Sequence, residues 1–177
     1  YPIRLVVPGY FGTYWVKHLS EIEVLDHVYD GFFMAKGYRV PDNDCFCIAP
    51  GTTPAQTRPI SKLPVRSFIT SVKQGDVLPL NKSVVLKGIA FDGGAGVNKV
   101  EISIDGGKVW REATLGQDLG RFSFREWTLA ITFTSKGATQ LMVRASNSAG
   151  ETQPLQADWN PAGYRRHVIE TSHVTVA

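Results

Sequence analysis

The chain has 177 residues, of which 43% are apolar and 20% are charged, and its formal net charge is +3. This length suits one ordinary domain, or a small domain with part of another. The apolar runs are too short to cross a bilayer, and the weak, dispersed positive charge does not indicate a nucleic-acid partner. We therefore expect a soluble globular protein with no membrane span and no nucleic-acid partner.

The first fifty residues combine short candidate elements with many aromatic side chains. Residues 3–7 (IRLVV) predict a buried strand, and the alternation in residues 21–25 (EIEVL) predicts a second. Residues 13–19 between them favour one helical turn or an irregular loop. Two basic residues, Arg4 and Lys17, lie among these apolar stretches and require an explanation.

The composition changes near residue 50. Residues 49–64 contain four prolines and few large apolar side chains, so we take 51–64 as a proline-rich linker. From residue 65 onward the chain shows short alternating segments separated by turn signals, and Asp105-Gly106-Gly107 indicates a hairpin. The candidate strands lie within 65–72, 81–94, 97–115, 121–133, 139–154 and 167–177.

These patterns predict a mainly β protein. Residues 65–177 are expected to form an immunoglobulin-like antiparallel β-sandwich, and residues 1–50 a short α+β segment before it. Trp110 follows the Gly-Gly hairpin and is expected to cap the core. The expected core residues are Val84, Leu86, Ile89, Val100, Ile102, Ile104, Trp110, Phe122, Phe124, Trp127, Leu141 and Val143.

Cysteines and histidines give no sign of a metal site. Cys45 and Cys47 are separated by one residue, so we expect a disulfide between them to be strained and predict two part-buried thiols. No histidine has metal-type spacing to these thiols or to another histidine. No common catalytic motif is present, so we assign neither a catalytic residue nor a metal ligand.

Several stretches resemble the sulfite oxidase family of molybdenum enzymes, in particular the bacterial sulfite dehydrogenases. YPIRLVVPG followed by VKHL resembles the end of the family's molybdopterin domain. Three stretches resemble its dimerisation domain and one its closing segment: VVLKGIAFDGG, VEISIDGGKVWREATL and FREWTL, and then WNPAGYRRHVIE. The series is in the family's order and covers almost the whole chain.

The resemblance implies that the chain is a C-terminal portion. Residues 1–50 would be the end of the molybdopterin-binding domain, and residues 65–177 the dimerisation domain. A molybdenum–molybdopterin cofactor would be bound mostly by residues upstream, including the cysteine that ligates molybdenum. Neither Cys45 nor Cys47 is at that cysteine's position.

The resemblance also assigns candidate cofactor-binding residues. Arg4 and Lys17 match the arginine and lysine that contact the phosphate end of the pterin, and a buried phosphate requires such cations. Gly12, with Gly9, would allow a tight backbone path and N–H donation. His18 stands where the family usually has tryptophan, and either senses substrate, relays protons or packs with one hydrogen bond. The ordinary alternative is that Arg4 pairs with a carboxylate and Lys17 extends into water.

Two departures match the bacterial branch of the family better than the animal one. The family's arginine before Val16-Lys17 is absent, and Pro161 and Ala162 occupy the place of an arginine that reaches the substrate pocket. The basic pair Arg165-Arg166 is expected to form surface ion pairs, or to contact the partner subunit or the molybdopterin domain.

The function that the resemblance implies is oxidation of sulfite with water to sulfate, with electrons passing to a c-type cytochrome. The full-length protein would be a periplasmic homodimer, and this chain alone would be inactive. The alternatives are a related molybdopterin enzyme, such as a sulfane dehydrogenase or a nitrate reductase, or a free-standing immunoglobulin-like interaction module.

Overall fold

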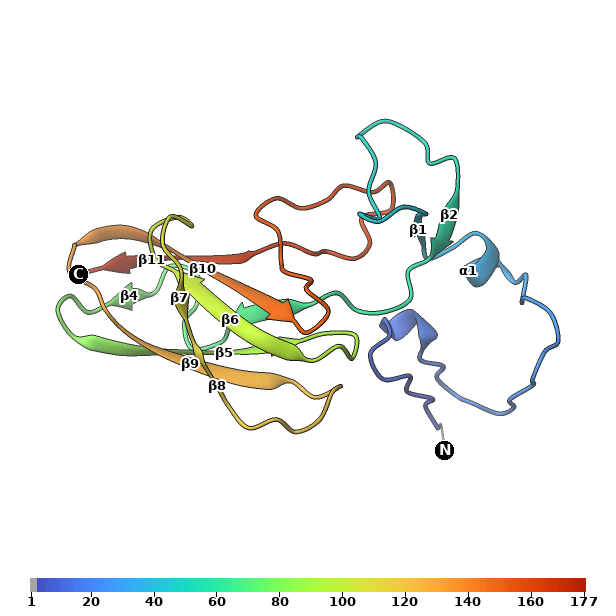
Figure 1. The fold of residues 1–177 in the computed structure, drawn as a ribbon, viewed down its shortest axis with the longest axis horizontal. Coiled ribbons are helices and arrows are strands. Elements are labelled where there is room, and N and C mark those ends of the chain that lie inside the picture. Colours follow the sequence, from blue (N-terminus) through green and yellow to red (C-terminus); the bar gives the residue numbers. More distant parts are fainter. Residues whose placement is uncertain (1–2) are drawn as a thin grey trace. The chain divides into compact units, whose positions relative to one another are not determined.

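The computed structural model describes residues 3–177, so Tyr1 and Pro2 of the opening motif lie outside the described residues. The chain divides into two compact units. The N-terminal unit comprises Tyr1–Leu63 and Ala157–Arg166, and the β unit comprises Pro64–Gln156 and His167–Ala177. Figure 1 shows the elements of each unit in chain order.

The N-terminal unit contains little regular structure. Its elements are the 3-10 turn η1 (Gly12–Tyr14), the helix α1 (Phe32–Ala35) and the strands β1 (Arg39–Pro41) and β2 (Thr57–Pro59). β1 and β2 pair antiparallel, so the expected proline-rich linker contains a paired strand. Val40 and Ile60 are buried in this unit.

The two strands expected near the start of the chain are not formed. Residues 21–25 have no strand partner among the described residues, and Ile22 and Val24 are 71% and 93% exposed. Residues 3–7 form only isolated backbone hydrogen bonds and are also largely exposed. An apolar pattern forms a strand only where a neighbouring strand supplies a ladder of backbone hydrogen bonds, and neither segment belongs to such a ladder within residues 3–177.

The β unit is a sandwich of two sheets, as predicted (Figure 1). Among the described residues, β4 and β11 pair in parallel, and every other pair of strands in this unit is antiparallel. One sheet has the order β4 (Val77–Leu78), β11 (Glu170–Val176), β10 (Gly137–Asn147), β6 (Val97–Ser103) and β7 (Arg111–Glu112). The other has the order β3 (Arg66–Ile69), β5 (Ser83–Phe91), β9 (Arg125–Thr132) and β8 (Thr114–Leu115).

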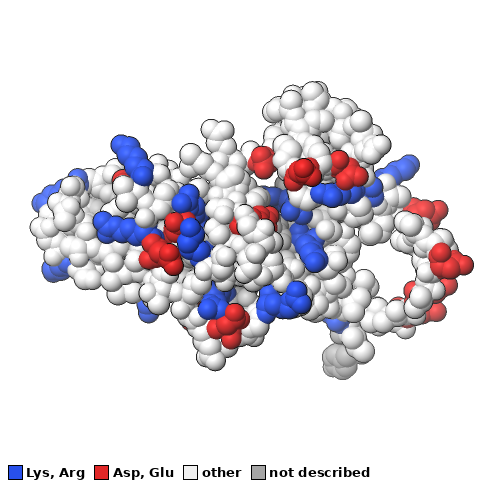
Figure 2. All heavy atoms as spheres, in the orientation of Figure 1, with Lys and Arg blue, Asp and Glu red and all other residues white. Residues whose placement is uncertain are grey.

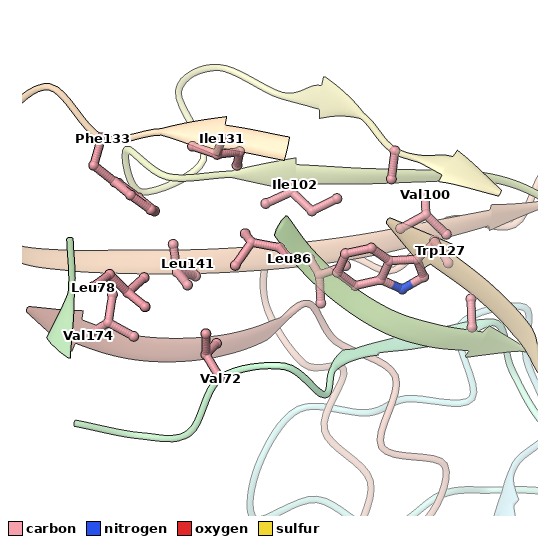
Figure 3. Close-up of a cluster of buried hydrophobic side chains, with 14 of the residues drawn as sticks. Val72, Leu78, Leu86, Val100, Ile102, Trp127, Ile131, Phe133, Leu141 and Val174 are labelled. Atoms are coloured by element: carbon pink, nitrogen blue, oxygen red, sulfur yellow. The ribbon is translucent and has the colours of Figure 1, made fainter. Parts of the chain in front are cut away.

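The core lies between the two sheets, where the side chains labelled in Figure 3 gather. Val84, Ile104 and Ile89 are partly buried, and the first two pack against this core. Six of the predicted core residues are buried there: Leu86, Val100, Ile102, Trp127, Leu141 and Val143.

Phe122 and Phe124 were wrongly predicted as core. They are 48% and 58% exposed and precede the first residue of β9. The inward side chains of β9 are at odd positions, including Trp127 and Ile131, so Phe122 and Phe124 are out of phase with them. The ring of Phe124 instead packs edge-on against Phe91, with ring centroids 5.2 Å apart. Trp110 is partly buried, and the guanidinium of Arg144 lies 4.1 Å from its ring.

Gly88 shows how closely the four-stranded sheet packs on its tryptophan. A Cβ atom at this position would lie 2.2 Å from the indole of Trp127 and 2.0 Å from the carbonyl oxygen of Phe68. Glycine in the middle of β5 therefore makes room for the ring that fills the core. No helix within residues 3–177 is long and apolar enough to span a membrane.

Candidate functional site

The segments that carry Arg4 and Lys17 lie side by side in the N-terminal unit. Two backbone hydrogen bonds join them and run in opposite directions, as in an antiparallel pair. These bonds place Arg4 opposite the Lys17–His18 step. The bonds are Leu5 N–H to Val16 O (2.9 Å) and Leu19 N–H to Ile3 O (3.0 Å).

The connection between the two segments is fixed by a turn and a tryptophan. Gly9 has a φ of +78°, which glycine adopts without steric cost. The indole N–H of Trp15 donates to Val7 O at 3.0 Å and so links the end of the connection to its beginning. The predicted role of Gly9 in a tight backbone path agrees with this geometry.

This connection is anchored on residues 61–63 of the same unit. Leu63 N–H donates to Gly9 O at 2.8 Å, and Ser61 N–H donates to the hydroxyl of Tyr14 at 3.1 Å. The connection between the two basic residues is therefore fixed by a backbone hydrogen bond and by the hydroxyl of Tyr14.

Arg4 and Lys17 line one open depression of about 200 Å³, together with Ile3 and His18. Both cationic side chains are exposed, and neither has an ion pair or a hydrogen bond among the described residues. Two positive charges that share a depression without an internal counter-charge repel one another unless an anion or water screens them. The arrangement therefore suits an anionic ligand, for which an arginine fork and a lysine ammonium are common partners.

Gly12 and His18 differ in their relation to this depression. Gly12 begins η1 and does not line the depression, and a Cβ atom there would meet nothing within 4 Å. His18 lines the depression, is exposed and has a φ of +54°. It has no hydrogen bond among the described residues, so the alternative of a packed imidazole with one hydrogen bond is wrong.

The two cysteines form a disulfide, which contradicts the prediction of free thiols. The intervening Phe46 has a φ of +55°, which brings the two Cα atoms to 5.1 Å, within the ordinary range for a disulfide. The side chain of Asn43 supports this turn by accepting from Cys47 N–H and donating to Cys47 O. A disulfide across a single residue forms here because the backbone at Phe46 is left-handed, which the cysteine spacing alone does not indicate.

Two arginines contact the ring of Phe46, and the sequence pattern did not predict these contacts. The guanidinium carbons of Arg58 and Arg165 lie 4.2 and 3.8 Å from the centre of its ring. Arg165 also donates to the carbonyl oxygens of Ile60 and Lys62. Only the unusual Cys-Phe-Cys order marked this place in the sequence.

The described residues contain no group of three or more histidine, cysteine or acidic side chains placed to hold a metal ion. In the view of Figure 2, basic and acidic side chains are interspersed over the surface, without one broad basic face.

Two stretches of the chain match models of known protein domains. Residues 57–170 match the model of the Mo-co oxidoreductase dimerisation domain, and residues 1–33 match that of the oxidoreductase molybdopterin binding domain. A sulfite oxidase of Arabidopsis thaliana is 34% identical over 97% of this chain and 45% of its own length. A nitrate reductase of Brassica napus is 30% identical over 92% of this chain and 20% of its own length.

A solved structure shares the fold. The sulfane dehydrogenase SoxCD of Paracoccus pantotrophus superposes with a TM-score of 0.75 and 24% identity, over 96% of this chain and 43% of that chain. The chain thus spans less than half the length of each of these relatives. It belongs to the sulfite oxidase family of molybdenum-cofactor oxidoreductases, with the dimerisation domain over residues 57–170 and a stretch of the molybdopterin-binding domain over residues 1–33.

Proposed function

We propose that the chain is the C-terminal part of a molybdenum-dependent sulfite dehydrogenase that oxidises sulfite to sulfate and passes electrons to a c-type cytochrome. The observation that carries the proposal is the depression that Arg4 and Lys17 line together without a counter-charge from residues 3–177. The similarity to a plant sulfite oxidase supports the choice of substrate.

Within this enzyme, Arg4 and Lys17 bind the terminal phosphate of molybdopterin. The guanidinium offers two parallel N–H donors, and the ammonium adds a compact positive charge in the same depression. His18 lines the same depression and can donate a further hydrogen bond, and Gly12 leaves the backbone open to close approach. When bound, the cofactor supplies the oxygen-transfer and redox chemistry, and this chain supplies binding and electrostatics.

The β unit forms the dimer scaffold of the same enzyme. The match to the Mo-co dimerisation domain supports a homodimer. By analogy with the family's bacterial members, we place the enzyme in the periplasm.

The proposal is tested by replacing the two cations in the full-length protein. Because each variant loses a charged hydrogen bond to the phosphate, we expect Arg4→Ala and Lys17→Ala each to weaken cofactor binding about tenfold or more. Molybdenum and pterin content per protomer, measured after purification under limiting cofactor, report this loss. Lys36→Ala is the matched control, because Lys36 is an exposed lysine of the same unit outside the depression. Full cofactor content in both variants would contradict the assignment.

The substrate is tested separately, because the family includes other reactions. The similarity to nitrate reductases makes nitrate reduction the second candidate. Purified full-length enzyme should reduce cytochrome c with sulfite and should not turn over nitrate. A full-length protein that purifies without molybdenum or pterin would instead indicate an immunoglobulin-like interaction module.

A further inference from the structure

The loop of residues 42–48 contains the Cys45–Cys47 disulfide. It lies between the two stretches that the family models match, residues 1–33 and 57–170. Cys45 is exposed and Cys47 is half-buried, so the disulfide can be reached from solvent through Cys45. This loop takes no part in the proposed cofactor site.

Phe46, the residue between the two bonded cysteines, has an unusual backbone conformation. Its φ of +55° lies in the left-handed region, which a bulky side chain rarely adopts. The guanidinium carbons of Arg58 and Arg165 lie 4.2 and 3.8 Å from the centre of its ring, so two cations contact it. The conformation of Phe46 thus depends on the disulfide, on the Asn43 hydrogen bonds and on these two contacts.

The disulfide fixes the local loop far more than it stabilises the whole fold. It links residues only two positions apart, and closing so small a loop removes little entropy from the unfolded chain. Opening it would allow Phe46 to return to a common backbone conformation. Exposed disulfides of this kind are the ones most readily exchanged.

We propose that Cys45–Cys47 is a thiol–disulfide exchange site for a dithiol reductant, and that its reduction releases Phe46 from Arg58 and Arg165. A thiolate of the reductant attacks the exposed Sγ of Cys45, a mixed disulfide forms, and Cys47 leaves as a thiolate that takes up a proton. The second thiol of the reductant then attacks the mixed disulfide and displaces Cys45, which also ends as a thiol. Two electrons and two protons pass to the protein, and the reductant becomes a cyclic disulfide.

Release of Phe46 also loosens the neighbouring segment. Arg58 donates to Asn43 O at 3.3 Å and pairs with Asp42 at 3.4 Å, so the loop and β2 share contacts. These contacts lie on the protein surface and depend on the loop geometry. Reduction should therefore increase motion in residues 42–48 and 57–62 and leave the β unit unchanged.

The experiment uses the full-length protein oxidised with oxidised dithiothreitol, and then treated with reduced dithiothreitol. Acid quench, alkylation and intact mass give the rate at which the disulfide opens in native buffer and in denaturing guanidinium chloride. We expect the native rate to be within about tenfold of the denatured rate, since an exposed site needs no unfolding. A native rate slower by about 100-fold or more, or a protein that forms no disulfide, would overturn the proposal.

Hydrogen exchange on the same samples tests the release of Phe46. We expect amide exchange in residues 42–48 to rise about tenfold on reduction, with no change in Ser83–Phe91 of β5. The double variant Cys45→Ser/Cys47→Ser should show the fast exchange without any reductant. If the disulfide opens but exchange in residues 42–48 stays the same, the release of Phe46 is refuted. Neither result depends on the cofactor site, so the proposed function stands or falls separately.

Discussion

Trp127 and Ser67 show how a single polar contact is accommodated in the core of the sandwich. The indole N–H of Trp127 donates to the hydroxyl of Ser67 at 2.9 Å, and that hydroxyl donates to Ile89 O at 3.0 Å. Both side chains are almost fully buried, so neither group has water as an alternative partner. A tryptophan can fill this core because its one polar atom is satisfied.

Ser67→Ala is expected to lower the free energy of unfolding by about 1–3 kcal/mol, because it leaves the buried indole N–H without an acceptor. Chemical denaturation followed by tryptophan fluorescence measures the change. Ser83→Ala is the matched control, since Ser83 is exposed at the start of β5 and its loss should have little effect. Equal stability of the two variants would show that the hydrogen bond is dispensable.

Individual residues were predictable where periodicity governs them. Leu86 and Ile102 follow the alternation of their strands and are buried as predicted. Phe124 lies one residue before β9 begins, and strand ends are not encoded by alternation. The pairing of Cys45 with Cys47 depends on a left-handed backbone at the residue between them, which no composition rule for phenylalanine predicts.

At the scale of elements, an ion pair joins the central strand of the five-stranded sheet, β10, to its neighbour β6. Arg144 of β10 lies opposite Glu101 of β6, and its Nε donates to the carboxylate at 2.9 Å. Lys99 contributes a second contact at 3.3 Å. Burial raises the pKa of Glu101, but the hydrogen bonds from Arg144 and Lys99 outweigh it and leave the pKa below its usual value.

This lowered pKa predicts how stability depends on pH. The unfolded chain takes up the proton at a higher pH than the folded chain, so the contribution is present above the unfolded pKa and is lost as pH falls through the folded one. The free energy of unfolding of wild type should exceed that of Glu101→Gln by about 1 kcal/mol at neutral pH. This difference should begin to shrink as the pH falls past the ordinary glutamate pKa of about 4.3 and should vanish below the lower pKa of the folded protein. Denaturation of both proteins across this range measures it. Glu112→Gln, an exposed neighbour on β7 that has no ion pair among the described residues, should show no such trend.

Elements were predictable in the β unit and not in the N-terminal unit. In the β unit each alternating segment has a neighbouring strand, so local pattern and pairing agree. Residues 21–25 alternate equally well but have no partner strand among the described residues, and they are exposed. The candidate site was proposed from the resemblance and not from local pattern. Arg4 and Lys17 are well separated in the sequence, and the backbone pairing of their segments brings them to one depression.

At the scale of the whole molecule, the two units differ in how they bury apolar side chains. The β unit has a continuous core between its sheets. The stretch that matches the molybdopterin-binding model exposes many large apolar side chains. They are more numerous than the single apolar residues that are normal on a protein surface. The most exposed are Ile3, Ile22, Val24, Val28, Tyr29, Phe32 and Phe33.

This difference predicts that the polypeptide 64–177 behaves better alone than the chain 1–177. Residues 64–177 contain both sheets, so we expect one cooperative unfolding transition and weak binding of the dye ANS. The chain 1–177 should bind several-fold more ANS per molecule, because the dye reports exposed apolar surface. Val24→Ser with Val28→Ser should reduce that excess, since these side chains are 93% and 91% exposed and their replacement removes no core contact. Equal ANS binding by 64–177 and 1–177 would show that the first segment covers its own apolar surface in solution.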